Sequence, residues 1–301
     1  MKRWLWYGIA AAVFFGFWGL FDKLSAFQDI FASNFILYSA AFAVAILFVL
    51  FAGRIKFSKY SLLSGIFAGI GNFFVLYALV KNFVILVFPF VSMSAAAFFL
   101  IVYFTEKPRY TRKQKIFASL GLFLSFLGIF VVASGSVGFF NFIRQLTLDS
   151  NYITPAIVFM FGFSLWTYFT YKSVAKESVS PATYSFWTIF GSFVAAIITI
   201  LIFSPGVFGQ LGSLTKSGYI YPIFGGIFVA FGAYCTYSAF KTTTTKTKLQ
   251  EAIVAILANA ELVPLAILSY FVLGEKIVEG FIGTIIVLIG LFLIHYAEVS
   301  K

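Results

Sequence analysis

The sequence predicts an all-α integral membrane protein whose ten transmembrane helices form two inverted five-helix repeats. Three observations lead to this fold class: an apolar composition, a succession of long apolar stretches, and short motifs that occur twice. Hydrophobic residues make up 61% of the 301 residues and charged residues only 10%, with a mean hydropathy of +1.01. A soluble domain has about 45–50% apolar and about 25% charged residues. We therefore exclude a soluble globule and expect a lipid bilayer around the chain.

The apolar stretches have the length of about 20 residues that a helix needs to cross a bilayer. In chain order they are predicted at 4–22, 31–52, 61–80, 83–104, 115–134, 154–172, 182–204, 218–240, 249–273 and 281–297. The first five spans form one repeat, 1–135, which a connector, 136–153, joins to a second repeat, 154–301. Because five is odd, the second repeat enters the membrane from the opposite side, and inverted repeats with a site at their interface are typical of transporters.

The two repeats share motifs at matching positions. A Glu-Lys pair closes the fourth and the ninth span, and a Gly-Leu-Phe-Leu stretch begins 15 residues after each Glu. The matched residues are Glu106 and Glu275, Gly121 and Gly290, Gly65 and Gly226, Gly71 and Gly232, Lys23 and Lys172. Their offset rises from 149 to 161 and then to 169 residues, which indicates that loops of the second repeat have lengthened.

The net charge of +11 follows the topology of the membrane spans. With the N-terminus in the cytoplasm, 16 of the 21 basic residues fall inside, and five fall outside, Lys23 and Lys216 among them. The positive-inside rule therefore predicts a multi-pass protein of the cell membrane with both termini cytoplasmic. Met1-Lys2-Arg3 and the apolar run after it are interpreted as an uncleaved first helix. This distribution argues against nucleic acid as a partner.

These motifs resemble the drug/metabolite transporter superfamily, in its EamA-type ten-helix branch. The resemblance covers nearly the whole chain and rests on Leu273-Gly274-Glu275-Lys276 with Gly283 and Gly290, on Glu106-Lys107 with Gly121, on the aromatic run Phe14–Trp18 and on Pro89. The ninth span departs from the pattern, because Ala258 stands where a proline is expected and Pro264 follows six residues later. The resemblance implies that small organic solutes, often amino acids or other metabolites for export, move by alternating access. It also implies that spans 1–4 and 6–9 surround a central cavity, with spans 5 and 10 outside it.

Polar residues in the middle of spans are the first candidates for the site. Glu261 lies near the centre of the ninth span, where a carboxylate costs a few kcal/mol unless it is paired, protonated or hydrated. Glu261 has two possible roles: it interacts with the solute or with a proton as the coupling ion, or it has a purely structural role. Asn259 and Asn72 are further candidates, although a packing role is equally open for Asn72. Pro89 and Pro264 interrupt the symmetry-related fourth and ninth spans, either at the binding site or as packing kinks.

Tryptophan and tyrosine within spans are the second group, since their polar atoms need partners. These candidates for cavity lining are Trp18, Tyr38, Tyr77, Trp166, Tyr168, Trp187 and Tyr234. Tyr38 and Trp187 occupy matching positions at the 149-residue offset. An aromatic cavity favours amphipathic or aromatic solutes.

Other chemistries have little support in the sequence. Cys235 is the one cysteine and His295 the one histidine, and we found no metal-ligand spacing, nucleophile–base pair or phosphate-binding loop. We expect no cofactor, no metal site and no enzymatic activity. The leading interpretation is a secondary transporter, expected to be monomeric. A non-transporting scaffold or channel and a membrane-embedded lipid-modifying enzyme are the alternatives.

Overall fold

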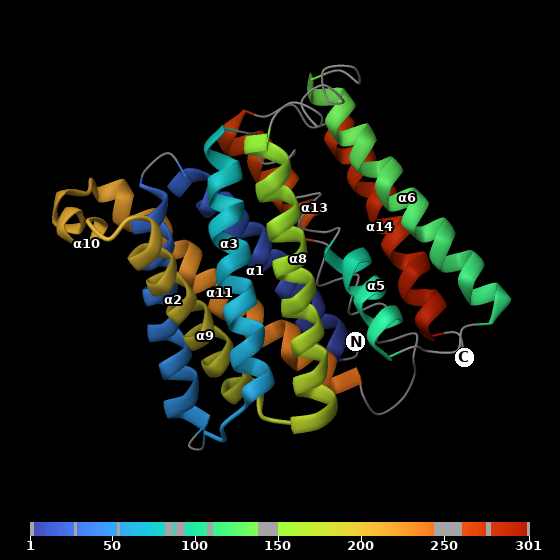
Figure 1. Cartoon of the computed structure of the whole chain (residues 1–301), viewed down its shortest axis with the longest axis horizontal. Coiled ribbons are helices and arrows are strands. Elements are labelled where there is room, and N and C mark those ends of the chain that lie inside the picture. Colours follow the sequence, from blue (N-terminus) through green and yellow to red (C-terminus); the bar gives the residue numbers. More distant parts are fainter. Residues whose placement is uncertain are drawn as a thin grey trace.

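In the computed structural model the chain is a bundle of helices (Figure 1). The structure describes residues 3–26, 29–52, 55–81, 87, 94–106, 111–137, 150–243, 261–274 and 278–299, which contain no strand. Their long helices are α1 Arg3–Ala26, α2 Ile30–Ala52, α3 Lys59–Lys81, α5 Ser94–Glu106, α6 Arg112–Val137, α8 Ser150–Lys172, α9 Pro181–Phe203, α11 Lys216–Thr243 and α14 Val278–Val299. Shorter pieces are the π-helical η1 Ser173–Glu177, α10 Val207–Gln210, the 3₁₀ turn η2 Leu211–Ser213, α13 Leu262–Leu268 and the π-helical η3 Ser269–Leu273. The all-helical prediction is confirmed for these residues.

Five of the helices, α1, α2, α3, α9 and α11, are long and apolar enough to cross a bilayer. Large apolar side chains cover much of the surface, and Phe51, Phe104 and Phe271 are 90%, 70% and 78% exposed. Water would penalise such a surface, whereas lipid tails match it. These features fit a membrane protein. The total of ten spans stays a prediction, because the first halves of the predicted fourth and ninth spans lie largely outside the described residues.

Several helices begin at side chains that cap their free backbone N–H groups. The Asp29 carboxylate accepts hydrogen bonds from the N–H groups of Phe31 and Ala32 at 2.8 and 2.9 Å, at the start of α2. Ser180 accepts one from the Thr183 N–H at 3.1 Å, and Pro181 occupies the first turn of α9. These caps fix where the polar connections stop and the apolar helices begin.

Glycines allow two pairs of helices to approach closely in parallel. On α3 and α9, Gly65 packs on the Thr188 carbonyl, and a Cβ added at Gly69 would lie 2.8 Å from the Ser192 carbonyl oxygen. On α11 and α2, Gly226 packs on the Leu37 carbonyl. Gly65 and Gly226 are matched residues of the two repeats, so the repeated glycines serve the same purpose in both.

Aromatic side chains show that two further pairs run antiparallel. Between α1 and α11, Phe14 contacts Phe231, while Phe21, further along α1, contacts Phe224, further back on α11; the ring centroids are 5.4 and 5.5 Å apart. Between α3 and α8, the contacts pass in the same way from Tyr60 with Phe169 to Gly71 with Phe163. The α2 and α9 helices are antiparallel too, with contacts that begin at Phe35–Phe193 and end at Phe42–Phe186.

The α6 and α14 helices lie side by side at one edge of the molecule (Figure 1). A Cβ added at Gly121 would lie 2.5 Å from the Gly290 carbonyl oxygen, and one added at Gly128 would lie 2.6 Å from the Gly283 carbonyl oxygen. Gly121 precedes Gly128 on α6 and Gly290 follows Gly283 on α14, so this pair is antiparallel. These two helices correspond to the predicted spans 5 and 10, and their place outside a central cavity stays a prediction.

Candidate functional site

Four aromatic rings from α1 and α8 meet inside the bundle and form what we call the central aromatic cluster: Phe15, Trp18, Phe163 and Trp166. Each ring contacts two others edge-on, at centroid distances of 5.8 Å for Phe15–Trp18, 5.9 Å for Phe15–Trp166, 6.0 Å for Trp18–Phe163 and 5.9 Å for Phe163–Trp166. Edge-to-face contacts at these distances are favourable. Two of the predicted lining residues, Trp18 and Trp166, are therefore brought together.

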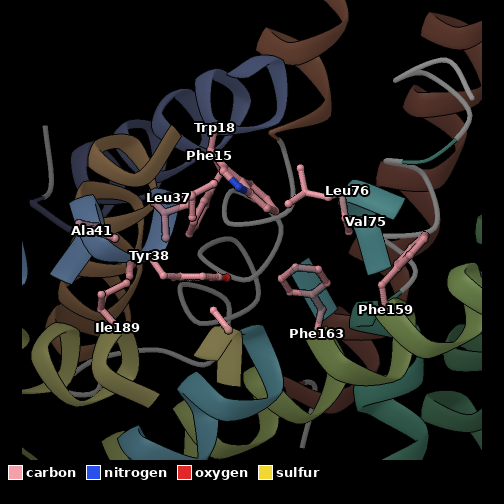
Figure 2. Close-up of a cluster of buried hydrophobic side chains, with 14 of the residues drawn as sticks. Phe15, Trp18, Leu37, Tyr38, Ala41, Val75, Leu76, Phe159, Phe163 and Ile189 are labelled. Atoms are coloured by element: carbon pink, nitrogen blue, oxygen red, sulfur yellow. The ribbon is translucent and has the colours of Figure 1, made fainter. Parts of the chain in front are cut away.

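Tyr38 of α2 lies beside this cluster. It is 3% exposed, and its hydroxyl donates a long hydrogen bond of 3.5 Å to the Ala68 carbonyl of α3. Figure 2 shows the Tyr38 hydroxyl, the Trp18 indole and the Phe163 ring directed toward one another. Leu76 of α3 lies next to these three side chains in the same view. Residues from α1, α2, α3 and α8 thus face a common centre.

A buried amide pair joins α2 to α3. Asn72 donates a hydrogen bond from Nδ2 to Oδ1 of Asn34 at 3.2 Å, and both residues are about 1% exposed or less. Among the described residues, Asn34 Nδ2 and Asn72 Oδ1 have no partner. One donor and one acceptor of the pair are therefore left for a group that the described residues do not supply. Asn34 was not singled out in the sequence, because a polar residue near the predicted start of a span resembles a cap.

Glu261 and Pro264 lie where α13 meets α1. Glu261 is 5% exposed and immediately precedes α13. Pro264 packs against Gly16, where an added Cβ would lie 2.7 Å from the proline Cγ. This contact places α13 against α1. The other two candidates on the broken spans, Asn259 and Pro89, lie outside the described residues.

Four predicted lining residues lie away from the central aromatic cluster. Tyr77 is 37% exposed on α3. The Trp187 indole donates to the Lys56 carbonyl at 2.9 Å, at an exposed end of the bundle. Tyr168 lies 5.2 Å under the Lys172 ammonium, and Tyr234 contacts Phe48 on α2 at 5.0 Å. The structure thus gives these four side chains other neighbours.

The structure corrects the sequence analysis at the end of the first span. That span was expected to end at residue 22, with Asp22 at its end, but α1 continues to Ala26. Asp22 is 0% and Lys23 7% exposed, and the Lys23 ammonium donates to the Leu79 carbonyl of α3 at 2.7 Å. The signal that ended the prediction was the drop in hydropathy at Asp22-Lys23. The helix continues because the side chains find buried surroundings.

A second polar group was also missed, which we call the hydroxyl network: Ser64, Thr170 and Tyr184. The Thr170 hydroxyl pairs with the Tyr184 hydroxyl at 2.6 Å and with the Ser64 hydroxyl at 3.1 Å. All three are fully buried or nearly so. Hydroxyls are common in helix interfaces, and only the packing shows which of them meet.

The described residues contain no group of three or more His, Cys, Asp or Glu side chains that could hold a metal ion. Comparison with known proteins adds the fold alone. No family profile matches the chain, and no curated protein matches its sequence. A solved structure described only as "Crystal structure of protein" superposes with a TM-score of 0.65 over 100% of this chain and 99% of that one, at 14% identity. This likeness extends over the full length of both chains.

Proposed function

We propose that the chain is a secondary transporter that moves small organic solutes across the cell membrane by alternating access. Its ten spans form two inverted five-helix repeats, and both termini are cytoplasmic. Amino acids and other aromatic or amphipathic metabolites are the candidate solutes, export is the candidate direction, and a proton is the candidate coupling ion.

The pairing of the helices supports the inverted repeat. The repeats match α1 with α8, α2 with α9, α3 with α11, and α6 with α14. When each helix is exchanged for its match, the antiparallel pair α1–α11 becomes α8–α3, which is also packed and antiparallel. The parallel pair α2–α11 becomes α9–α3, which is also packed and parallel. The α2–α9 and α6–α14 pairs exchange into themselves and are antiparallel. Matched helices that run in opposite directions are what an inverted repeat produces.

The central aromatic cluster is the observation that carries the proposal. Phe15 and Trp18 match Phe163 and Trp166 at an offset of 148 residues. The contacts Phe15–Trp166 and Trp18–Phe163 exchange into each other at this offset, which therefore replaces the 149 residues of the Lys23–Lys172 match for α1 and α8. The four rings that touch are therefore the same two residues supplied once by each repeat. A site on the axis between inverted halves is where alternating access needs the solute, since rocking of the halves then exposes it to either side. The rings favour an apolar or aromatic body in that place.

The proposal is tested by uptake of labelled solutes into proteoliposomes, with a panel of aromatic amino acids, aromatic amines and neutral metabolites. We expect saturable uptake of at least one class. Trp166→Ala removes two edge-on ring contacts and should reduce that uptake roughly tenfold. Trp187→Ala is the matched control, because Trp187 lies outside the central aromatic cluster, and its uptake should stay near that of the native protein. Rates equal to those of protein-free liposomes for the whole panel would contradict the proposal.

A further inference from the structure

Asp22 is a buried carboxylate that the described residues leave without a hydrogen bond. It is 0% exposed, and neither of its oxygens has a hydrogen-bond partner among them. The Trp18 indole, one turn earlier on α1, interacts with it. Tyr38 lies within electrostatic range on α2. Burial of a carboxylate without a compensating partner costs free energy. The presence of Asp22 at this buried position therefore needs an explanation.

The second repeat shows how the same position looks when its hydrogen bonds are complete. The run Phe15-x-x-Trp18-x-x-Phe21-Asp22 matches Phe163-x-x-Trp166-x-x-Phe169-Thr170 at the 148-residue offset, so Thr170 is the counterpart of Asp22. Thr170 bonds to Tyr184 and Ser64 of the hydroxyl network. The two repeats therefore differ in charge and in hydrogen bonding at one matched position.

The position from which Asp22 lacks a hydrogen-bonding side chain lies on α11. Ser64 on α3 corresponds to Gly225 on α11 at the 161-residue offset of the matched glycines. A Cβ added at Gly225 would lie 3.8 Å from Oδ1 of Asp22, so Gly225 is adjacent to the carboxylate. Beside Thr170 the Ser64 hydroxyl of α3 occupies this position, whereas beside Asp22 the matched residue of α11, Gly225, has no side chain.

We propose that Asp22 binds the protonated amine of the transported solute, an inference that rests on the proposed function and narrows its substrate class. A carboxylate next to aromatic faces is the arrangement that recognises an organic cation, by an ionic hydrogen bond and by cation–π attraction. Trp18 belongs to the central aromatic cluster and interacts with Asp22, so the two features are contiguous. The ammonium of Lys23, the next residue, is hydrogen-bonded to Leu79 on α3. The solute class is an amine with an apolar or aromatic body.

Binding to the purified full-length protein in detergent tests the charge requirement without transport. The probes are 2-phenylethylamine, its uncharged match 2-phenylethanol and its anionic match 3-phenylpropionate, followed by calorimetric titration. We expect the amine to bind at least about tenfold more tightly than the alcohol, which is the effect of one charge-assisted hydrogen bond. Asp22→Asn keeps the shape and should remove that preference. Equal affinities for amine and alcohol in the native protein, or no binding of the amine, overturn the inference.

A second pair of variants keeps Asp22 itself intact. Gly225→Ser places a hydroxyl donor next to Asp22, as Ser64 does for Thr170, and should weaken amine binding by about tenfold because the carboxylate is then satisfied internally. Gly225→Ala adds a methyl group in the same space, where its neighbours Leu37 and Phe21 lie at 3.3 and 3.5 Å. The difference between the two variants isolates the hydroxyl. Equal amine affinities in both variants contradict the role of Asp22.

The outcome also separates this inference from the proposed function. If proteoliposomes take up neutral or anionic solutes and Asp22→Asn does not change the selectivity, the chain is a transporter and Asp22 is not its amine site. If the amine binds in an Asp22-dependent way but no solute crosses the membrane, the site exists and the transport proposal fails. Thr170→Val is the symmetry control, since it changes the matched position of the other repeat and should keep the amine preference.

Discussion

Replacing Gly121 by alanine should force α6 and α14 apart. The added Cβ would lie 2.5 Å from the Gly290 carbonyl oxygen, 0.9 Å short of ordinary van der Waals contact at 3.4 Å, and the obstacle is rigid backbone. The reciprocal change, Gly290→Ala, brings its Cβ to 2.6 Å from the Gly121 carbonyl oxygen, 0.8 Å short. Overpacking of this kind typically costs about 1–3 kcal/mol. Because the two glycines face each other, we expect both single variants to lose similar amounts.

Unfolding of the purified protein in mixed micelles, titrated with sodium dodecyl sulfate, measures these losses. The double variant should lose less than the two single losses together, since helices already parted by one methyl group accommodate the second, and the coupling should be at least about 0.5 kcal/mol. Gly209→Ala is the control: it lies in the short helix α10 with nothing within 4 Å of an added Cβ, and should change stability by no more than about 0.5 kcal/mol. Full additivity, or a single variant as harmless as Gly209→Ala, would refute the close antiparallel contact.

Three further predictions concern topology, the ninth span and the hydroxyl network. In a background without the native cysteine, a cysteine at Lys216 should react with an impermeant reagent from outside the cell and one at Arg109 only after the membrane is opened, as the distribution of basic residues requires. Glu261→Gln cannot ionise, so we expect a folded protein whose uptake has lost its pH dependence; an unchanged pH profile would remove Glu261 from the mechanism. Tyr184→Phe removes the hydroxyl that bonds to Thr170 at 2.6 Å and should lower the free energy of unfolding by about 1 kcal/mol, with uptake retained.

The sequence predicted features that depend on local chemistry. The repeated glycines coincide with close helix contacts, because a residue without a side chain lets two helix backbones approach each other. Gly121 and Gly290 were matched by their Gly-Leu-Phe-Leu motif and by its spacing from Glu106 and Glu275, and they face each other across α6 and α14. Trp18 and Trp166 were selected as aromatic residues in mid-span, and they meet in the central aromatic cluster.

Features that depend on tertiary packing were not predictable. The match of Tyr38 with Trp187 assumed a 149-residue offset, whereas the packing of Leu37 under Gly226 and of Thr188 under Gly65 gives 151 residues between α2 and α9. Two residues rotate a helix position by about 200°, which moves a side chain to the opposite face. Tyr38 accordingly lies inside the bundle while Trp187 reaches the Lys56 carbonyl.

Asp22 was missed for a related reason. A span predicted from hydropathy ends at the first charged pair, because the hydropathy of a segment contains no information about the other helices that bury that pair. The comparison that singles out Asp22 needs both the internal repeat and the contacts of its counterpart Thr170 with Ser64 and Tyr184.

Countertransport in proteoliposomes tests alternating access most directly. Liposomes preloaded with an unlabelled solute that binds the purified protein are diluted into a trace of the same solute carrying a label. An alternating-access transporter should carry unlabelled solute out and labelled solute in, so that the labelled solute inside transiently exceeds its equilibrium concentration. This overshoot should disappear when the liposomes are not preloaded. Flux that rises linearly with concentration without an overshoot would indicate a channel. Absence of any protein-dependent flux for solutes that bind would indicate a non-transporting scaffold, and either result would contradict the account.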